Sequence, residues 1–266
     1  DIDQRFQLSE NIKNLGLSET RNNGANLASG KYLAFVDGDD LVDVVALHEI
    51  LQKSQNNSDL FIIGYEELDD LTGTTAQTQE RREILLGIDA ETAPVSLPIN
   101  NPVWCHVHNA AHFKKNLRFI GRQREDRDFC FRSFLAASEI NVFTLRSVIK
   151  YRVNRRDQNS IMQRELQPEG VDFFIQHLER FLDDIKKQYP KKCTKNKQLF
   201  IYRYLKNICW EFQETSKRYP QDILSRFATK LTGISLSLMI ALTDLYKIIH
   251  NEGPDTGCVS LIAYLN

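Results

Sequence analysis

The sequence lacks a strong net charge, a cysteine motif and a long apolar run. Its 34 Lys and Arg residues nearly balance 35 Asp and Glu residues, and the net charge is -1. A chain with this balance has no overall attraction to nucleic acid, so any site for a polyanion must be local. The five cysteines include no Cys-x-x-Cys pair, which argues against a zinc or redox motif and favours free thiols in a reducing compartment.

The longest apolar stretch, residues 234–249, contains Asp244 and Lys247 and is shorter than the ~20 residues that a membrane-spanning helix needs. The opening residues 1–14 are polar and contain no signal-peptide core. We therefore expect a folded globular chain. Its 266 residues allow one large domain, or a domain with an appendage.

Helix and strand patterns alternate in the first part of the chain. Ser18 and Gly30 are typical of a helix start and a helix stop, which predicts a helix between them. The apolar run at 31–36 predicts a buried parallel strand that ends in a polar loop. A helical pattern at 44–51 and a second buried strand at 60–63 follow. This order is that of an α/β fold.

Further along, residues 125–137 have the spacing of a helix, and two strands are predicted at 141–145 and 148–153. After about residue 165 helical spacing predominates. We therefore expect an α/β domain over residues 1–165 and a mainly helical C-terminal region over residues 166–266.

Three carboxylates, Asp37, Asp39 and Asp40, lie within four residues at the end of the first predicted strand. Open α/β sheets bind ligands outside the carboxyl ends of their strands. Clustered carboxylates repel one another unless a cation or hydrogen-bond donors compensate. A hard divalent ion such as Mg2+ or Mn2+ uses one or two carboxylates together with substrate phosphates. The alternative is a solvated acidic turn, because Asp-Gly is a common turn pair.

The stretches around this loop resemble family 2 glycosyltransferases. They are Gly16-Leu-Ser-Glu-Thr-Arg-Asn-Asn-Gly24 and Ala28-Ser-Gly-Lys-Tyr-Leu-Ala-Phe-Val-Asp-Gly-Asp-Asp40. In that family an Arg-Asn pair opens a helix, and a strand ends in Asp-x-Asp-Asp. Further blocks follow in the family's order, and together they span residues 14–162: Pro102-Val-Trp104, Leu117-Arg-Phe119, Glu125-Asp126, Tyr151-Arg-Val-Asn154 and Asn159-Ser-Ile161.

The resemblance implies a GT-A (Rossmann-like) nucleotide-diphospho-sugar transferase sheet over residues 1–165. The family normally begins with a Pro-x-Tyr-Asn-like loop and an Asp-Asp-Gly-Ser-like loop, which grip the base and ribose of the donor. Residues 1–15 contain neither motif, and the first residue is Asp1 rather than Met. We therefore expect a sheet that is incomplete at its N-terminus.

The activity implied by the resemblance is metal-dependent transfer of a sugar from a nucleotide-diphosphate sugar to a hydroxyl acceptor, with inversion. By the family's pattern Asp39 and Asp37 hold Mn2+ or Mg2+, and Asp37 contacts the ribose of the donor or a water on the metal. Arg21 lies in the first turn of its helix, where it either reaches the donor, braces the acidic loop or lies at the surface. The metal offsets the charge that develops on the leaving diphosphate. Asp126 is assigned as the general base that takes the acceptor proton. The alternative for Glu125 and Asp126 is a charged helix start that complements the helix dipole.

Several other residues have two interpretations. Trp104 either stacks on an acceptor sugar or packs in the core. One of Arg152, Arg155 and Arg156 either meets the diphosphate, for which a guanidinium is well suited, or lies on a solvated face.

Three histidines, His106, His108 and His112, raise the question of a metal site. His108 and His112 are four apart, but no Glu stands between them in the arrangement of a zinc protease. Packing or acceptor contact is therefore the favoured interpretation.

A basic stretch in the helical region contains no acidic residue and is interleaved with apolar and aromatic ones. Basic residues near an anionic leaflet contribute about 1 kcal/mol each, and aromatic rings favour the interface. This predicts a cytoplasmic protein with peripheral contact to the inner membrane face; the alternative is a solvated basic face whose aromatic rings pack on the catalytic domain. The stretch comprises Lys191, Lys192, Lys195, Lys197, Leu199, Phe200, Ile201, Tyr202, Arg203, Tyr204 and Lys206.

Surface polysaccharide or glycolipid synthesis, with a saccharide or lipid-linked acceptor, is the pathway that the family suggests. Two other function classes remain as alternatives. A catalytically incomplete transferase-like domain would act as a binding or assembly module. A nucleotidyltransferase also uses metal-bound carboxylates on an α/β sheet, but the Gly-rich, Lys-bearing loop expected of one is not visible in the sequence.

Overall fold

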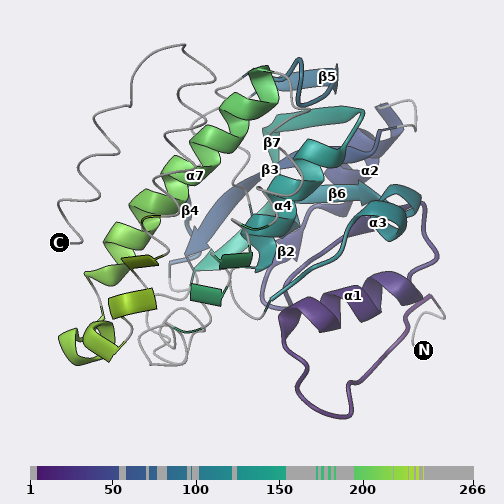
Figure 1. Cartoon of the computed structure of the whole chain (residues 1–266). Coiled ribbons are helices and arrows are strands. Elements are labelled where there is room, and N and C mark those ends of the chain that lie inside the picture. Colours follow the sequence, from purple (N-terminus) through teal and green to yellow (C-terminus); the bar gives the residue numbers. More distant parts are fainter. Residues whose placement is uncertain are drawn as a thin grey trace.

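The computed structural model describes residues 5–53, 58–69, 72–76, 83–94, 97, 102–121, 125–153, 195–217 and 219–226, with shorter pieces between 172 and 183 and between 228 and 236. Figure 1 shows helices packed around a central sheet. The helices are α1 (Leu17–Leu27), α2 (Val44–Lys53), α3 (Ala110–Asn116), α4 (Glu125–Ala136) and α7 (Lys195–Ser216), with a 3-10 turn η1 (Val103–Cys105). The strands are β1 (Tyr32–Ala34), β2 (Leu41–Val42), β3 (Leu60–Asp69), β4 (Thr75–Ala76), β5 (Ile84–Ile88), β6 (His106–Asn109) and β7 (Ile140–Val153).

The strands form one mixed sheet of seven. Its order is β1-β6-β3-β7-β2, with β4 paired to β3 and β5 paired to β7. β3 and β7 run parallel, and the other described pairs are antiparallel. The strand predicted at 31–36 exists as the shorter β1, but the expectation of parallel pairing is wrong for the described sheet. The reason is that β6, which belongs to a later block of the chain, returns alongside β1 in the opposite direction.

The pair β3 and β7 forms the centre of the sheet and is longer than predicted. β3 has 10 residues, because its polar second half continues to pair with β7. β7 has 14 residues and replaces the two strands predicted at 141–145 and 148–153. The register shifts around Gly64, where an added Cβ would lie 2.5 Å from the carbonyl oxygen of Arg146. This bulge keeps the pair continuous through a break in the hydrophobic pattern.

The helix α1 is confirmed, but both of its predicted ends are wrong. Its N-cap is Gly16, and Ser18 lies inside the helix, where its hydroxyl donates a hydrogen bond to the carbonyl oxygen of Gly121. The helix ends at Leu27, before Gly30. A long-range partner for the Ser18 hydroxyl therefore replaces the local capping bond that the sequence suggests.

The sheet is covered on both faces. On one face Ala46 and Ile50 of α2 pack with Phe61 and Val107. On the other face an aromatic cluster lies beneath α1, α3 and α4, in which Phe119 and Phe129 stack with ring centroids 3.8 Å apart. This second cluster packs the segment before α4 against α1 and β1.

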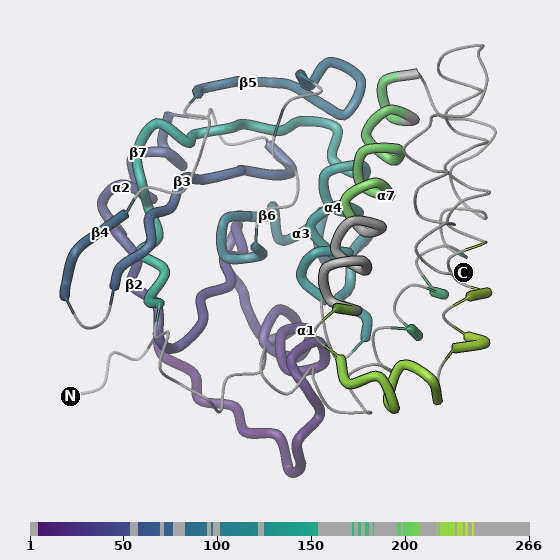
Figure 2. Tube along the Cα trace, turned by 90° about the vertical axis from the view of Figure 1, so that its left-hand side faces the viewer, coloured from purple at the N-terminus to yellow at the C-terminus, as the bar shows by residue number. Residues whose placement is uncertain are grey.

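The helix α7 packs its apolar face on α4, and both views show the two helices side by side (Figures 1 and 2). Phe131 and Tyr204 stack with centroids 4.1 Å apart, and Phe134 meets Phe200 edge-on at 4.8 Å. Phe200, Tyr202 and Tyr204 are buried. These rings form part of the protein core, which confirms for Phe200 and Tyr204 the alternative in which the aromatic rings pack on the catalytic domain. Peripheral membrane contact stays a prediction.

No helix in the part of the chain that the structure describes is both long and apolar enough to cross a lipid bilayer. Several predictions fall wholly or mostly outside the described residues. They concern the loop at 93–102, the domain boundary near 165, the helical pattern at 171–185, the apolar stretch 234–249, Lys191 and Lys192, and Arg155 and Arg156.

We expect Phe200→Ala to lower the free energy of unfolding by about 3 to 5 kcal/mol, because it removes a fully buried ring that meets Phe134. Urea denaturation measures the change. Asn207→Ala, at an exposed position on the same helix, is the matched control and should shift stability by no more than about 0.5 kcal/mol. Equal, small effects of the two substitutions would contradict the packing of α7 on α4.

Candidate active site

Arg21 on α1 joins two segments that are far apart in the sequence. Its Nη1 donates to Oε1 of Glu125 at 2.6 Å, and its Nη2 donates to Oδ1 of Asp37 at 3.1 Å. The guanidinium also lies over the ring of Phe119, 5.5 Å from the centroid. The side chains of Arg21 and Glu125 are only 10% and 7% exposed, so water screens this pair little. The acidic loop and the start of α4 are thereby held together.

Burial raises the pKa of Glu125, and the neighbouring charge of Asp126 raises it further. The charge of Arg21 and its hydrogen bond act in the opposite direction and lower this pKa. Arg21 therefore supplies the counter-charge that favours an ionised carboxylate at a buried position.

The acidic loop is a tight turn with its three carboxylates in different environments. The backbone N–H of Asp40 donates to the carbonyl of Asp37 at 3.0 Å. Asp37 faces Arg21, whereas the side chain of Asp39 is exposed. Oδ1 of Asp40 accepts the backbone N–H of Arg152 at 2.9 Å, which fastens the turn to β7. Asp39 is therefore the carboxylate most open to a ligand.

Asp40 points inward, and the pKa of its carboxyl is raised by burial and by the charges of Asp39 and Asp37. The hydrogen bond from the Arg152 backbone opposes this rise. Among the described residues, Oδ2 of Asp40 is buried without a hydrogen-bond partner. These contacts identify Asp40 as a brace for the turn that orients Asp37 and Asp39.

Three acids occupy the first turn of α4, and they differ in their partners. Glu125 binds Arg21, and the fully buried Asp128 binds both Arg132 and Arg180. Asp126 is partly exposed and accepts the backbone N–H of Arg127 at 2.8 Å, and in the described part of the chain it pairs with no cationic side chain. Of the three carboxylates, Asp126 is the one left available to a substrate.

Trp104 is 5% exposed and belongs to the core, so the packing interpretation is confirmed. Its ring stacks on Tyr151, which is 37% exposed and which the sequence analysis did not single out. The signal in the sequence that could have identified Tyr151 was its position at the start of the block Tyr151-Arg-Val-Asn154. Arg152 is partly exposed and lies next to the acidic loop through its backbone bond to Asp40.

Two of the three histidines pack in the core, and Nδ1 of the third, His112, lies 3.5 Å from Oδ1 of Asp59. His106 and His108 on β6 are fully buried. Burial lowers the pKa of His106 to about 3 and that of His108 well below its ordinary value. Both rings are therefore neutral near pH 7. No three His, Cys, Asp or Glu side chains converge on a metal position in the described residues, and Cys105 and Cys130 are buried free thiols.

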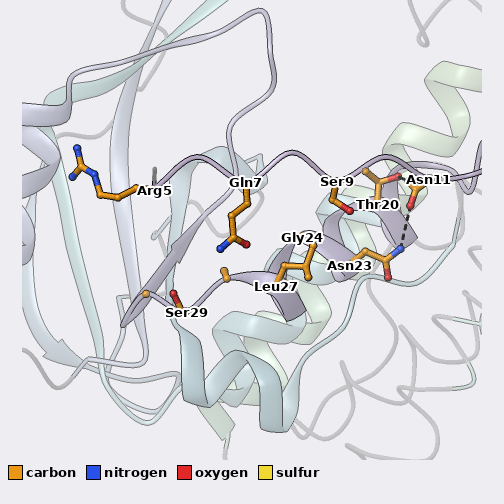
Figure 3. Close-up of a pocket in the computed structure, with 11 residues that line it drawn as sticks. Arg5, Gln7, Ser9, Asn11, Thr20, Asn23, Gly24, Leu27 and Ser29 are labelled. Carbon is orange, nitrogen blue, oxygen red and sulfur yellow. Dashed lines mark hydrogen bonds between the residues drawn. The ribbon is translucent and has the colours of Figure 1, made fainter. Parts of the chain in front are cut away.

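A separate polar cleft of about 510 Å³ lies between residues 5–11 and α1 (Figure 3). Asn23 donates to Asn11 across it at 3.3 Å. None of the carboxylates described above lines this cleft, so it is distinct from the acidic loop. Its lining residues are Arg5, Gln7, Ser9, Asn11, Thr20, Asn23, Gly24, Leu27, Ala28, Ser29 and Gly30.

Comparison with known families decides the identity of the N-terminal part, which carries Arg21 and the acidic loop. Residues 1–120 match the family model described as Glycosyl transferase family 2. This match covers less than half of the chain. The resemblance seen in the sequence is thus confirmed for the Arg-Asn helix and the Asp-x-Asp-Asp strand end.

The chain is also similar to individual proteins. It is 34% identical over 61 residues to the uncharacterized glycosyltransferase MJ1057 of Methanocaldococcus jannaschii, and this match covers 23% of the chain and 21% of the relative. Residues 1–349 of S. aureus TarS in complex with UDP-GlcNAc superpose with a TM-score of 0.65 at 16% identity, covering 94% of this chain and 70% of that TarS chain. The complex with UDP gives 0.63 at 15% identity, with 94% and 69% covered. The predicted GT-A glycosyltransferase fold is therefore confirmed.

We expect Arg21→Met to make stability more sensitive to pH. Because burial raises the pKa of Glu125, the folded protein binds this proton more tightly than the unfolded chain does, and stability falls as pH rises through the raised pKa. Loss of the Arg21 charge raises this pKa further and enlarges the fall. Urea denaturation from about pH 4 to about pH 8 measures this fall in the free energy of unfolding.

The control for this measurement is Glu125→Gln in the Arg21→Met background, in which the added pH dependence should disappear because the titrating group is gone. If Arg21→Met and the unchanged protein show the same pH profile, Arg21 does not hold Glu125 in its ionised form.

Proposed function

We propose that the protein is a glycosyltransferase that moves a sugar from a nucleotide-diphosphate sugar to a hydroxyl acceptor. The observation that carries this proposal is the Arg21 bridge, because it links the acidic loop to the helix start that bears Asp126. The family of residues 1–120 supports it. The UDP and UDP-GlcNAc bound to TarS favour a uridine-diphosphate sugar as donor here.

A divalent cation, Mg2+ or Mn2+, fits the acidic loop. Asp39 is exposed and Asp37 is 40% exposed, so both present carboxylate oxygens at the surface. Two carboxylates cannot complete an octahedral shell, which suits an ion that also binds substrate phosphates. Asp39 and Asp37 would hold the ion, which when bound offsets negative charge on the leaving diphosphate. Arg21, which donates a hydrogen bond to Asp37, would keep this carboxylate in position.

The acceptor hydroxyl must lose its proton as its oxygen attacks the anomeric carbon. We assign this proton to Asp126, because Glu125 and Asp128 are engaged by arginines and are buried. The bond from the acceptor oxygen to the anomeric carbon forms while the bond to the diphosphate oxygen breaks, and the diphosphate leaves with the electron pair. Such a single displacement inverts the anomeric centre, which NMR of the product anomer tests.

For the metal assignment we expect Asp39→Asn to abolish detectable transfer and the Mn2+-dependent part of donor binding, because one ligand charge is lost. Calorimetric titration of UDP with and without Mn2+ measures the binding. Asp222→Asn, which removes an exposed carboxylate from the C-terminal part, is the control and should behave as the unchanged protein. Full activity of Asp39→Asn would remove Asp39 from the site.

For the base we expect Asp126→Asn to lower kcat about 10²- to 10⁴-fold while donor affinity stays nearly unchanged, since only the acceptor proton loses its carboxylate. Steady-state kinetics together with donor titration separate the two effects. A variant that keeps kcat and loses donor affinity would show that Asp126 serves the donor and not the acceptor.

A further inference from the structure

Three aromatic rings form a cluster at the end of β7, and two of them stack. Tyr151 lies on Trp104 with centroids 5.2 Å apart and an interplanar angle of 16°, and Tyr65 meets Trp104 edge-on at 4.8 Å. Trp104 is 5% exposed, whereas Tyr151 is 37% exposed. Trp104 covers one face of the Tyr151 ring, so a ligand would pack on the opposite face.

This exposed ring lies beside the acidic loop. The backbone N–H of Arg152, the next residue along β7, holds Oδ1 of Asp40 at 2.9 Å. The pKa of Tyr151 is raised by burial first and then by the charges of Asp40, Asp39, Glu67 and Asp37, so the phenol lies within the field of the loop carboxylates.

The stack makes the Tyr151 ring a rigid surface. A tyrosine has only two side-chain torsions, and the Trp104 ring behind it restricts both, so little further entropy is lost when a ligand packs on it. A pyranose ring has an apolar face of C–H groups and a rim of hydroxyls. The Tyr151 ring could pack against the C–H face of the sugar, and the nearby carboxylates of the acidic loop could accept hydrogen bonds from the sugar hydroxyls.

We propose that Tyr151 is the platform on which a hexose ring packs beside the acidic loop. This inference rests on the proposed glycosyl transfer and adds a residue that orients a sugar next to the proposed metal ligands. Both the donor sugar and an acceptor sugar present the required apolar face. The experiment therefore determines whether the hexose that packs on Tyr151 belongs to the donor or to the acceptor.

The test substitutes Tyr151→Val, which removes the ring but suits a strand, and Tyr151→Phe, which keeps the ring and removes the hydroxyl. In the donor arm, UDP and UDP-GlcNAc are titrated calorimetrically in the presence of Mn2+. In the acceptor arm, saturation-transfer NMR follows the methyl glycosides of glucose, galactose and N-acetylglucosamine in Mg2+, with and without UDP. Leu145→Ala, an exposed position earlier on β7, is the matched control.

With Tyr151→Val we expect roughly 3- to 10-fold weaker binding in one arm, which identifies the hexose as donor or acceptor, while UDP alone binds as before. Tyr151→Phe should stay within about twofold of the unchanged protein, because the ring face remains. The proposal is overturned if Tyr151→Val binds as the unchanged protein does in both arms. It is also overturned if the affinity for UDP alone falls as much as the affinity for UDP-GlcNAc. Failure of the unchanged protein to bind UDP and UDP-GlcNAc instead contradicts the proposed function, and the glycoside arm without UDP still tests the platform.

Discussion

The site depends on a single guanidinium. Arg21 holds two carboxylates that would otherwise repel each other, one from the loop after β1 and one from the start of α4. Taking the charges of Arg21 and Glu125 out of water is costly, and such a pair is retained when its geometry and hydrogen bonds are good. Here both Nη atoms are used, and Phe119 supports the guanidinium. The distance between the loop and the helix is therefore set by an ion pair and not by the loops alone.

A second constraint acts from the other side of the loop. The parallel pair β3 and β7 crosses the centre of the sheet, and β7 continues far enough for its backbone N–H at Arg152 to reach Asp40. The bulge at Gly64 allows this continuation, since a side chain there would collide with the backbone at Arg146. The acidic turn is thus held at both ends, with Arg21 on Asp37 and β7 on Asp40. Asp39, between them, is left exposed.

The sequence was sufficient for the parts that depend on local pattern and failed where distant partners decide. The helix α4 and the acidic turn have the predicted positions, because helical spacing and a strand followed by Asp-Gly are local signals. The Ser18 cap was wrong because its hydroxyl has a partner near Gly121. The split of β7 was wrong because pairing with β3 overrides the polar interruption. Likewise, residue type alone does not show which aromatic side chain is exposed: Trp104 is buried by the fold, whereas Tyr151 lies at the surface.

The contact between α4 and α7 also bears on the order in which the chain folds during synthesis. The rings of Phe131 and Phe134 are covered by Tyr204 and Phe200, which the ribosome adds much later. Domains fold as their segments emerge, and uncovered apolar surface is where nascent chains associate wrongly. Until α7 has emerged, the helix that bears Asp126 has an apolar face without this cover. Maturation of the N-terminal half is therefore tied to completion of a segment that contributes none of the proposed catalytic side chains.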